Sequence, residues 1–151
     1  MNFNNNIEVK NYLRNQYEKI HKYLVSVFGK RMCEISKNFI YLNQVLDNKV
    51  KVLFTLEIET MVSILEQKMM VLKYQKRRIE HMSSVNETIL NLLNNQKNSK
   101  QEKNNFISND LLVIVKNEIN EIDHLKKSFE HLIIIVIDFL NRLDFLRLNC
   151  I

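Results

Sequence analysis

The fold is decided by the stretch Thr55–Ile79, TLEIETMVSILEQKMMVLKYQKRRI, in which apolar residues recur among charged ones. The apolar residues follow one another at steps of three or four, the period of one face of an α-helix. This stripe consists of Ile58, Met61, Val62, Leu65, Met69, Leu72 and Ile79. Because a single helix cannot bury its own stripe, this one has to pack against another helix. The stretch therefore predicts a chain built to hold helices, either its own or those of a partner.

The composition of the chain favours an all-α fold. The 151 residues include no proline and one glycine, Gly29. Since sheets need turn residues about every ten positions whereas helices need only caps, this composition predicts helices throughout. We expect a single domain, residues 1–151, folded as an elongated antiparallel helical bundle or coiled-coil-like hairpins of three to four long helices.

Apolar spacing divides the chain into segments. We expect an N-terminal helix at about 7–29, long helices at 31–54 and 56–93, a flexible connector at 94–106 and a C-terminal helix at 108–149. The segment 31–54 carries a coiled-coil seam of Met32, Ile35, Phe39, Leu42, Leu46, Val50 and Leu53. The stripe of the next helix extends through Met82, Val85, Ile89 and Leu92.

Three predicted boundaries rest on local signals. Gly29 can end or bend the first helix. Thr55 can cap a new helix, because Glu57 in the first turn favours the helix dipole; a continuous helix stays open as the alternative. Ser84 has the capping-box spacing, so a break near it is also open.

The chain carries a positive net charge of +5, which permits binding to nucleic acid or to an anionic surface. Acidic residues are interleaved with the basic ones, as is usual for a solvated helix face. The strongest basic cluster is Lys73–Arg78, KYQKRR, but no pattern of a base-reading helix accompanies it. The sequence therefore does not favour nucleic acid as the main partner, and a weakly basic nucleic-acid-binding helical protein remains an alternative.

The sequence predicts a cytoplasmic protein without a membrane span. The longest unbroken apolar run, Leu132–Ile137, is far shorter than the roughly 18 residues that a membrane span requires. The N-terminus lacks the features of a secretion signal. Cys33 and Cys150 form no motif, which suits a reducing compartment where both stay thiols.

Catalytic and metal-binding patterns are thin, so we expect no enzyme, no cofactor and no metal. Glu121 and His124 form a Glu-x-x-His pair, as found in di-iron bundles. Those sites require a second such pair and two more carboxylates. With one glycine, the chain also lacks a phosphate-cradling loop.

The region Leu46–Arg78 resembles the FlgN-type flagellar export chaperones. Glu66 and Lys68 stand at the lysine motif of that family, and Arg77 and Arg78 at its downstream basic pair. Downstream, the stretch KNEIN is similar to the Asn-x-x-Asn element of the family through its Asn117 and Asn120. The resemblance covers about two-thirds of the chain. Its motifs lie on two amphipathic helices, and the separation between them is also similar to that in the family.

The resemblance implies a non-enzymatic chaperone that binds the C-terminal amphipathic helices of the two hook-filament junction proteins and keeps them unassembled before export. The export apparatus would be a further possible partner. We expect the client on the last helix, whose apolar face is too wide for a single seam. The predicted client contacts are Ile119, Ile122, Leu125, Phe129, Leu132, Ile133, Val136 and Phe139.

Two alternatives remain open at this stage. The wide apolar face is equally explained if the last helix is central in its own bundle. A structural coiled-coil tether or assembly subunit fits the heptads as well, and the spacing does not reveal whether the chain forms a homo-oligomer.

Overall fold

The computed structural model describes residues 3–42, 44, 48–98 and 109–149. Helix α1 (Phe3–Lys22) runs through a π-helical segment, η1 (Tyr23–Phe28), into α2 (Gly29–Leu42). Helix α3 is Asn48–Asn98 and helix α4 is Asn109–Leu148. All of these elements are helices, so the predicted all-α fold is confirmed.

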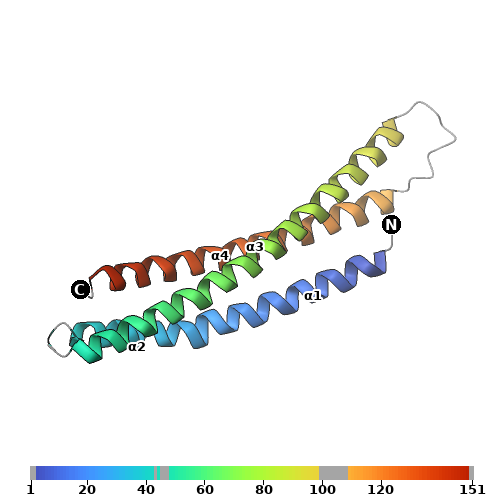
Figure 1. The fold of residues 1–151 in the computed structure, drawn as a ribbon. Helices are drawn as coiled ribbons and strands as arrows, with labels where there is room; N and C mark the ends of the chain where they lie inside the picture. Colours follow the sequence, from blue (N-terminus) through green and yellow to red (C-terminus); the bar gives the residue numbers. More distant parts are fainter. Residues whose placement is uncertain (1–2, 43, 45–47, 99–108, 150–151) are drawn as a thin grey trace.

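The helices form an elongated antiparallel bundle (Figure 1). Helix α1, η1 and α2 together make one long helix, and α3 returns in the opposite direction. Helix α4 reverses again, so it runs parallel to α1. The main interface joins α3 to α4, and the N-terminal helix packs on that pair chiefly through α1 and α4. This is the arrangement expected when long amphipathic helices bury their stripes against one another.

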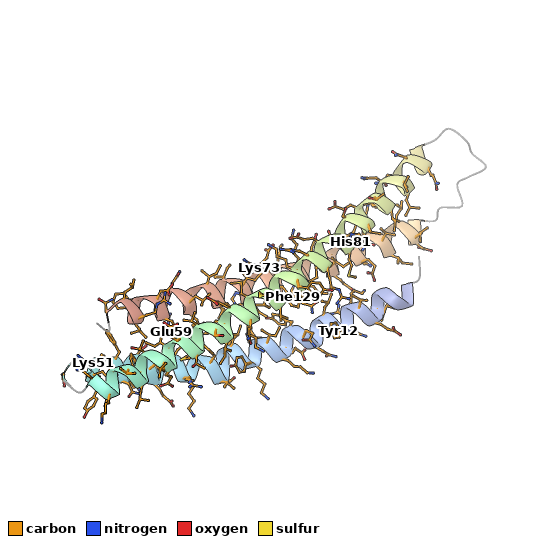
Figure 2. All side chains as sticks on the ribbon, in the orientation of Figure 1. Tyr12, Lys51, Glu59, Lys73, His81 and Phe129 are labelled. Carbon is orange, nitrogen blue, oxygen red and sulfur yellow. The ribbon has the colours of Figure 1, made fainter. Side chains whose placement is uncertain are left out.

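Buried apolar side chains from all the helices form one core cluster, which includes Phe129, labelled in Figure 2. Phe129 of α4 is fully buried, and Tyr17 of α1 meets its ring edge-on with 6.1 Å between the ring centroids. The opening stripe is buried as predicted, with Met69 half-buried and the other six members at most 9% exposed. The core therefore runs lengthwise, with an aromatic pair near its middle.

The π-helical segment η1 has a simple cause in the sequence. Buried residues Ile20, Leu24, Phe28 and Met32 follow one another at steps of four. In an α-helix each such step turns the side chain by about 40° relative to the previous one, so the row would leave the core. The wider turn of η1, closed by the Gly29 N–H donating to the Leu24 carbonyl, keeps the row on one face.

The predicted helix end at Gly29 is wrong, because the helix passes through it. Gly29 has φ −60° and ψ −40°, which are ordinary right-handed helical angles. The Cβ of an alanine there would meet the Leu24 carbonyl oxygen at 3.4 Å and the Phe139 ring at 3.9 Å, both ordinary contacts. Nothing in the backbone at this position requires glycine.

The predicted start of a new helix at Thr55 is wrong, and the break left open near Ser84 does not occur, since α3 is continuous. The Thr55 hydroxyl donates to the Lys51 carbonyl at 2.9 Å, which satisfies it inside a helix rather than as a cap. The Ser84 carbonyl likewise accepts a bond from Thr88 at 3.0 Å, one turn further on. The continuous helix, left open as the alternative, is what the structure contains.

The predicted seam of 31–54 is correct only as far as Leu42. The chain reverses between Leu42 and Asn48, and Leu46 lies outside the described residues. Beyond the reversal Val50 and Leu53 are exposed, while Phe54 points inward and stacks against Phe39 with 6.4 Å between the ring centroids. A new helix starts with a new phase, so heptad spacing that continues through a reversal has no structural meaning.

The far end of α3 departs from the predicted pattern in a similar way. Val85 and Leu92 are exposed, whereas Asn86 is buried with its Nδ2 unbonded. Helix α3 also continues through Asn98, so the predicted connector at 94–106 starts too early. Its remainder and residue 108, where the last helix was expected to begin, lie outside the described residues.

Candidate functional site

The predicted client contacts lie on the inward face of α4. Ile122, Leu125, Phe129, Leu132 and Val136 are buried in the core of the bundle. The other three, Ile119, Ile133 and Phe139, are half-buried. In this structure the chain covers these residues with its own helices, as the alternative of a central last helix proposed. A client meets them only if the bundle opens.

Helices α2 and α4 both terminate at the same end of the bundle (Figure 1), and exposed apolar side chains of both helices lie there. Ile40 of α2 and Phe145 of α4 are 67% and 62% exposed. They share a groove of about 460 Å³, which we call the α2–α4 groove. Its lining residues are Ser36, Phe39, Ile40, Asn141, Arg142, Phe145 and Leu146.

A second apolar recess adjoins the same end of the bundle, at the start of α3. It measures about 440 Å³ and is lined by Asn48, Lys49, Val52 and Leu53. The Phe39–Phe54 stack joins α2 to α3 in this region. Exposed apolar side chains of all three long helices thus lie near one end, a pattern typical of an interaction surface.

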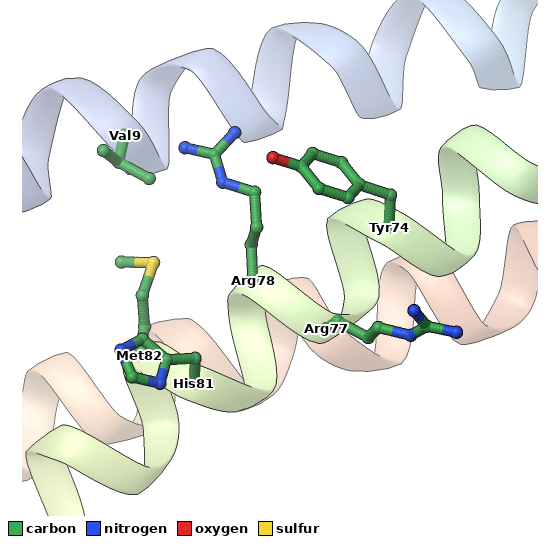
Figure 3. A pocket seen from close by; sticks show the side chains of 6 residues that line it. All are labelled: Val9, Tyr74, Arg77, Arg78, His81 and Met82. Carbon is green, nitrogen blue, oxygen red and sulfur yellow. The ribbon is translucent and has the colours of Figure 1, made fainter.

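A third recess, the basic cleft, lies between α1 and α3 and measures about 470 Å³ (Figure 3). Its lining residues are Val9, Tyr74, Arg77, Arg78, His81 and Met82. Arg78 extends from α3 toward α1, and its guanidinium lies 5.9 Å from the centroid of the Tyr12 ring. The same group donates to the Gln75 side chain at 3.4 Å. The structure therefore places the basic pair of the predicted motif in a cleft.

The other motif residues lie apart from one another. Glu66 is exposed, and the Lys68 Nζ sits 5.0 Å from the centroid of the Tyr23 ring. Asn117 and Asn120 are exposed on α4. These four residues form no common site in this structure.

The sequence interpretation missed a partly buried ion cluster that joins α1 to α4. The Lys10 Nζ donates to Glu118, and also to Glu121 at 2.6 Å; Arg14 lies 3.6 Å from the same Glu121 carboxylate. Lys10 is 5% exposed. Burial lowers the pKa of Lys10, but hydrogen bonds and charges of the two glutamates outweigh it, so the pKa lies above its ordinary value. The sequence feature that could have indicated this cluster is the position of Lys10, a charged residue next to Val9 on the core-facing side of the helix.

Glu121 of the Glu-x-x-His pair belongs to this ion cluster. The carboxylate of Glu121 is held by Lys10 and Arg14, and the Lys10 hydrogen bond is the main cause that lowers its pKa. His124 is exposed. Among residues 3–42, 44, 48–98 and 109–149, no three His, Cys, Asp or Glu side chains gather closely enough to hold a metal ion.

Comparisons with protein-family models, curated proteins and solved structures found no match to this chain. The resemblance to the FlgN-type chaperones therefore stays a prediction. The described part of the chain contains no helix with the length and apolar character that crossing a bilayer requires. The geometry of the surface thus carries the functional argument.

Proposed function

We propose that this protein is a non-enzymatic holding protein that binds an amphipathic helix of a protein client in the α2–α4 groove. The observation that carries the proposal is the pair Ile40 and Phe145, two large apolar side chains more than half exposed on either side of one groove. Leaving both in water is unfavourable, and a client helix relieves this by burying them.

The shape of the groove supports a helix as the occupant. Two helices border it, and an apolar face laid into such a groove presents anchors at steps of three and four. Ser36, Asn141 and Arg142 provide a polar rim, and Arg142 is oriented by its ion pair with Asp138 at 3.1 Å. This combination of apolar centre and polar rim is usual for protein interfaces.

The client class follows from the resemblance to the FlgN-type chaperones. We propose that the clients are the C-terminal amphipathic helices of hook-filament junction proteins, held unassembled in the cytoplasm before export. A protein that binds the unassembled form stabilises it by mass action, which is all that a holding chaperone needs to do. In this proposal the client contacts the outer, C-terminal part of α4. The sequence had predicted a contact on the inner face of the same helix.

Co-expression with each of the two junction proteins, followed by affinity purification of this chain, tests the proposal. We expect one of them to co-purify with the intact chain and to be lost from Ile40→Asp and Phe145→Asp. The matched control is Ile134→Asp, because Ile134 lies on the same helix with 63% exposure but outside the groove.

Two results contradict this function. If neither junction protein co-purifies with the intact chain, the chaperone assignment fails. If sedimentation instead shows a stable homo-oligomer that Phe145→Asp dissociates, the groove is a contact between copies. The structural-tether alternative then replaces the chaperone.

A further inference from the structure

The positive charge of the basic cleft is not balanced by acidic residues among those that line it. Among the described residues, neither Arg77 nor Arg78 forms an ion pair. Their neighbour Lys76 is different, because Glu80 and Glu130 each lie 3.7 Å from its Nζ. No carboxylate is among the lining residues of the cleft. The cleft therefore presents two arginines and an imidazole with no internal anion to bind.

The guanidinium of Arg78 is held in a defined place. It lies over the Tyr12 ring, and its Nη1 donates to the side chain of Gln75, which is itself buried. In Figure 3 it projects between the two helices beside Val9 and Tyr74, and Arg77 extends along the flank of α3. A guanidinium fixed in this way loses little freedom on binding, and it suits bidentate contact with a phosphate group.

The cleft also offers an apolar and aromatic part. Val9 and Met82 line it, and the Tyr74 ring is 60% exposed at its mouth. Tyr74 and Met82 are eight residues apart on α3, so this wall is about 12 Å long. A wall of that length, with a volume of about 470 Å³, can accommodate a ligand of small-molecule size.

From these observations we propose that the basic cleft binds a nucleotide unit. Arg78, which projects between the two helices, contacts the phosphate, and the base lies against the neighbouring Tyr74 ring. Arginine supplies charge-assisted hydrogen bonds to phosphate oxygens, and an aromatic face accepts any base by stacking. A free mononucleotide and one nucleotide of a single strand share this chemistry.

Calorimetric titration of the full chain tests the site with adenosine monophosphate, adenosine, inorganic phosphate and a single strand of about 12 deoxyadenylates. We expect adenosine monophosphate to bind, with adenosine and phosphate each weaker by about tenfold or more, because each lacks one half of the contacts. Arg78→Gln should weaken the nucleotide by a similar factor. Arg31→Gln, which removes an arginine of α2 outside the cleft, should leave the affinity unchanged.

The strand distinguishes the two sources of the nucleotide. If it binds no tighter than the mononucleotide, the ligand is a free nucleotide. If it binds much tighter and still depends on Arg78 and Tyr74, the ligand is part of a strand. Circular dichroism checks the folding of each variant. If Arg78→Gln fails to fold, Tyr74→Ala, a change at an exposed position, tests the site instead.

Several outcomes overturn the proposal. One is the absence of binding by both the mononucleotide and the strand. Another is binding that Arg78→Gln and Tyr74→Ala leave unchanged, because diffuse attraction to a basic surface is then sufficient. Phosphate that binds as tightly as the nucleotide, or a glutamate-rich peptide that binds more tightly, would also contradict a nucleotide site. The client-binding function does not depend on this result, since its groove lies on α2 and α4.

Discussion

Lys10 of α1 and Glu118 of α4 form a hydrogen-bonded ion pair that is almost wholly removed from water, with side-chain exposures of 6% and 14%. Lys10 bonds the Oε1 atom of Glu118, and the other oxygen, Oε2, has no hydrogen-bond partner among the described residues. The pair joins residues more than one hundred positions apart in sequence and fixes the register of the N-terminal helix on α4. The basic cleft depends on this register, because Val9, which lines it, is the sequence neighbour of Lys10.

We predict that Lys10→Met lowers the free energy of unfolding by about 3 kcal/mol, because it leaves the Glu118 carboxylate buried without a cation. The double variant Lys10→Met with Glu118→Leu should recover most of the loss, since both charges are then absent. Urea unfolding followed by circular dichroism measures both. Lys19→Met, at an exposed lysine of the same helix, is the control, and an equal effect there would contradict a role for the buried pair.

The same cluster predicts a pH dependence of stability. The pKa of Glu121 is lowered by its hydrogen bond to Lys10, so the folded protein releases this proton more readily than the unfolded chain does. The stabilisation is complete well above the ordinary pKa of 4.5 and is lost as the pH falls through the lower pKa of the folded state. Because Glu121 is about half exposed, we expect less than about 1 kcal/mol from it.

Unfolding of the intact chain and of Glu121→Gln between pH 7 and pH 3 measures this effect. The stability difference between the two should shrink as the pH falls. Lys10 gives the opposite pH dependence. Because its pKa is raised in the folded protein, its contribution to stability is lost as the pH rises above 10.5. A difference between the two proteins that is constant with pH would show that Glu121 does not titrate in the cluster.

Gly29→Ala should stabilise the protein by about 0.5 to 1 kcal/mol, because alanine fits the helical angles and restricts the unfolded chain. Its Cβ meets only ordinary contacts with Leu24 and Phe139. Thermal unfolding of the variant and of Ser26→Ala, at an exposed position of η1, provides the comparison. A clear loss of stability in Gly29→Ala alone would mean that η1 requires glycine after all.

Two phenylalanines of α4 should behave oppositely. Phe129→Ala should lower the free energy of unfolding by about 3 to 5 kcal/mol, because Phe129 is fully buried. Phe145→Ala should change it by less than about 0.5 kcal/mol, because Phe145 faces water. Chemical denaturation of both variants measures the contrast. Equal effects would contradict the assignment of Phe129 to the core and of Phe145 to the surface.

The fold class and the buried stripe of α3 were predictable, because composition and helical period are local properties of the sequence. The reversal after Leu42 was not, because the seam spacing of Val50 and Leu53 continues through it and Thr55 imitates a cap. A serine or threonine hydroxyl can bond backward within a helix as well as cap one. Only the packing partner decides which of the two occurs.

The candidate sites were less predictable, because helical period assigns residues to a face but not to what covers that face. The inner face of α4 looked too wide for one partner helix. The N-terminal helix covers the part that α3 does not. Ile40 and Phe145 lie on different helices about one hundred residues apart, so no spacing connects them. Arg77 and Arg78 were recognised as a basic cluster, but the cleft needed Val9 from α1 to complete it.

Hydrogen–deuterium exchange of this chain, with and without the C-terminal helix of a junction protein, tests the proposed client site most directly. The account predicts added protection at residues 36–42 and 141–148, with exchange in the α3–α4 core unchanged. Faster exchange at residues 119–136 on client addition would contradict it, because the client would then enter by opening the bundle. The absence of any change in exchange at saturating client would contradict it as well.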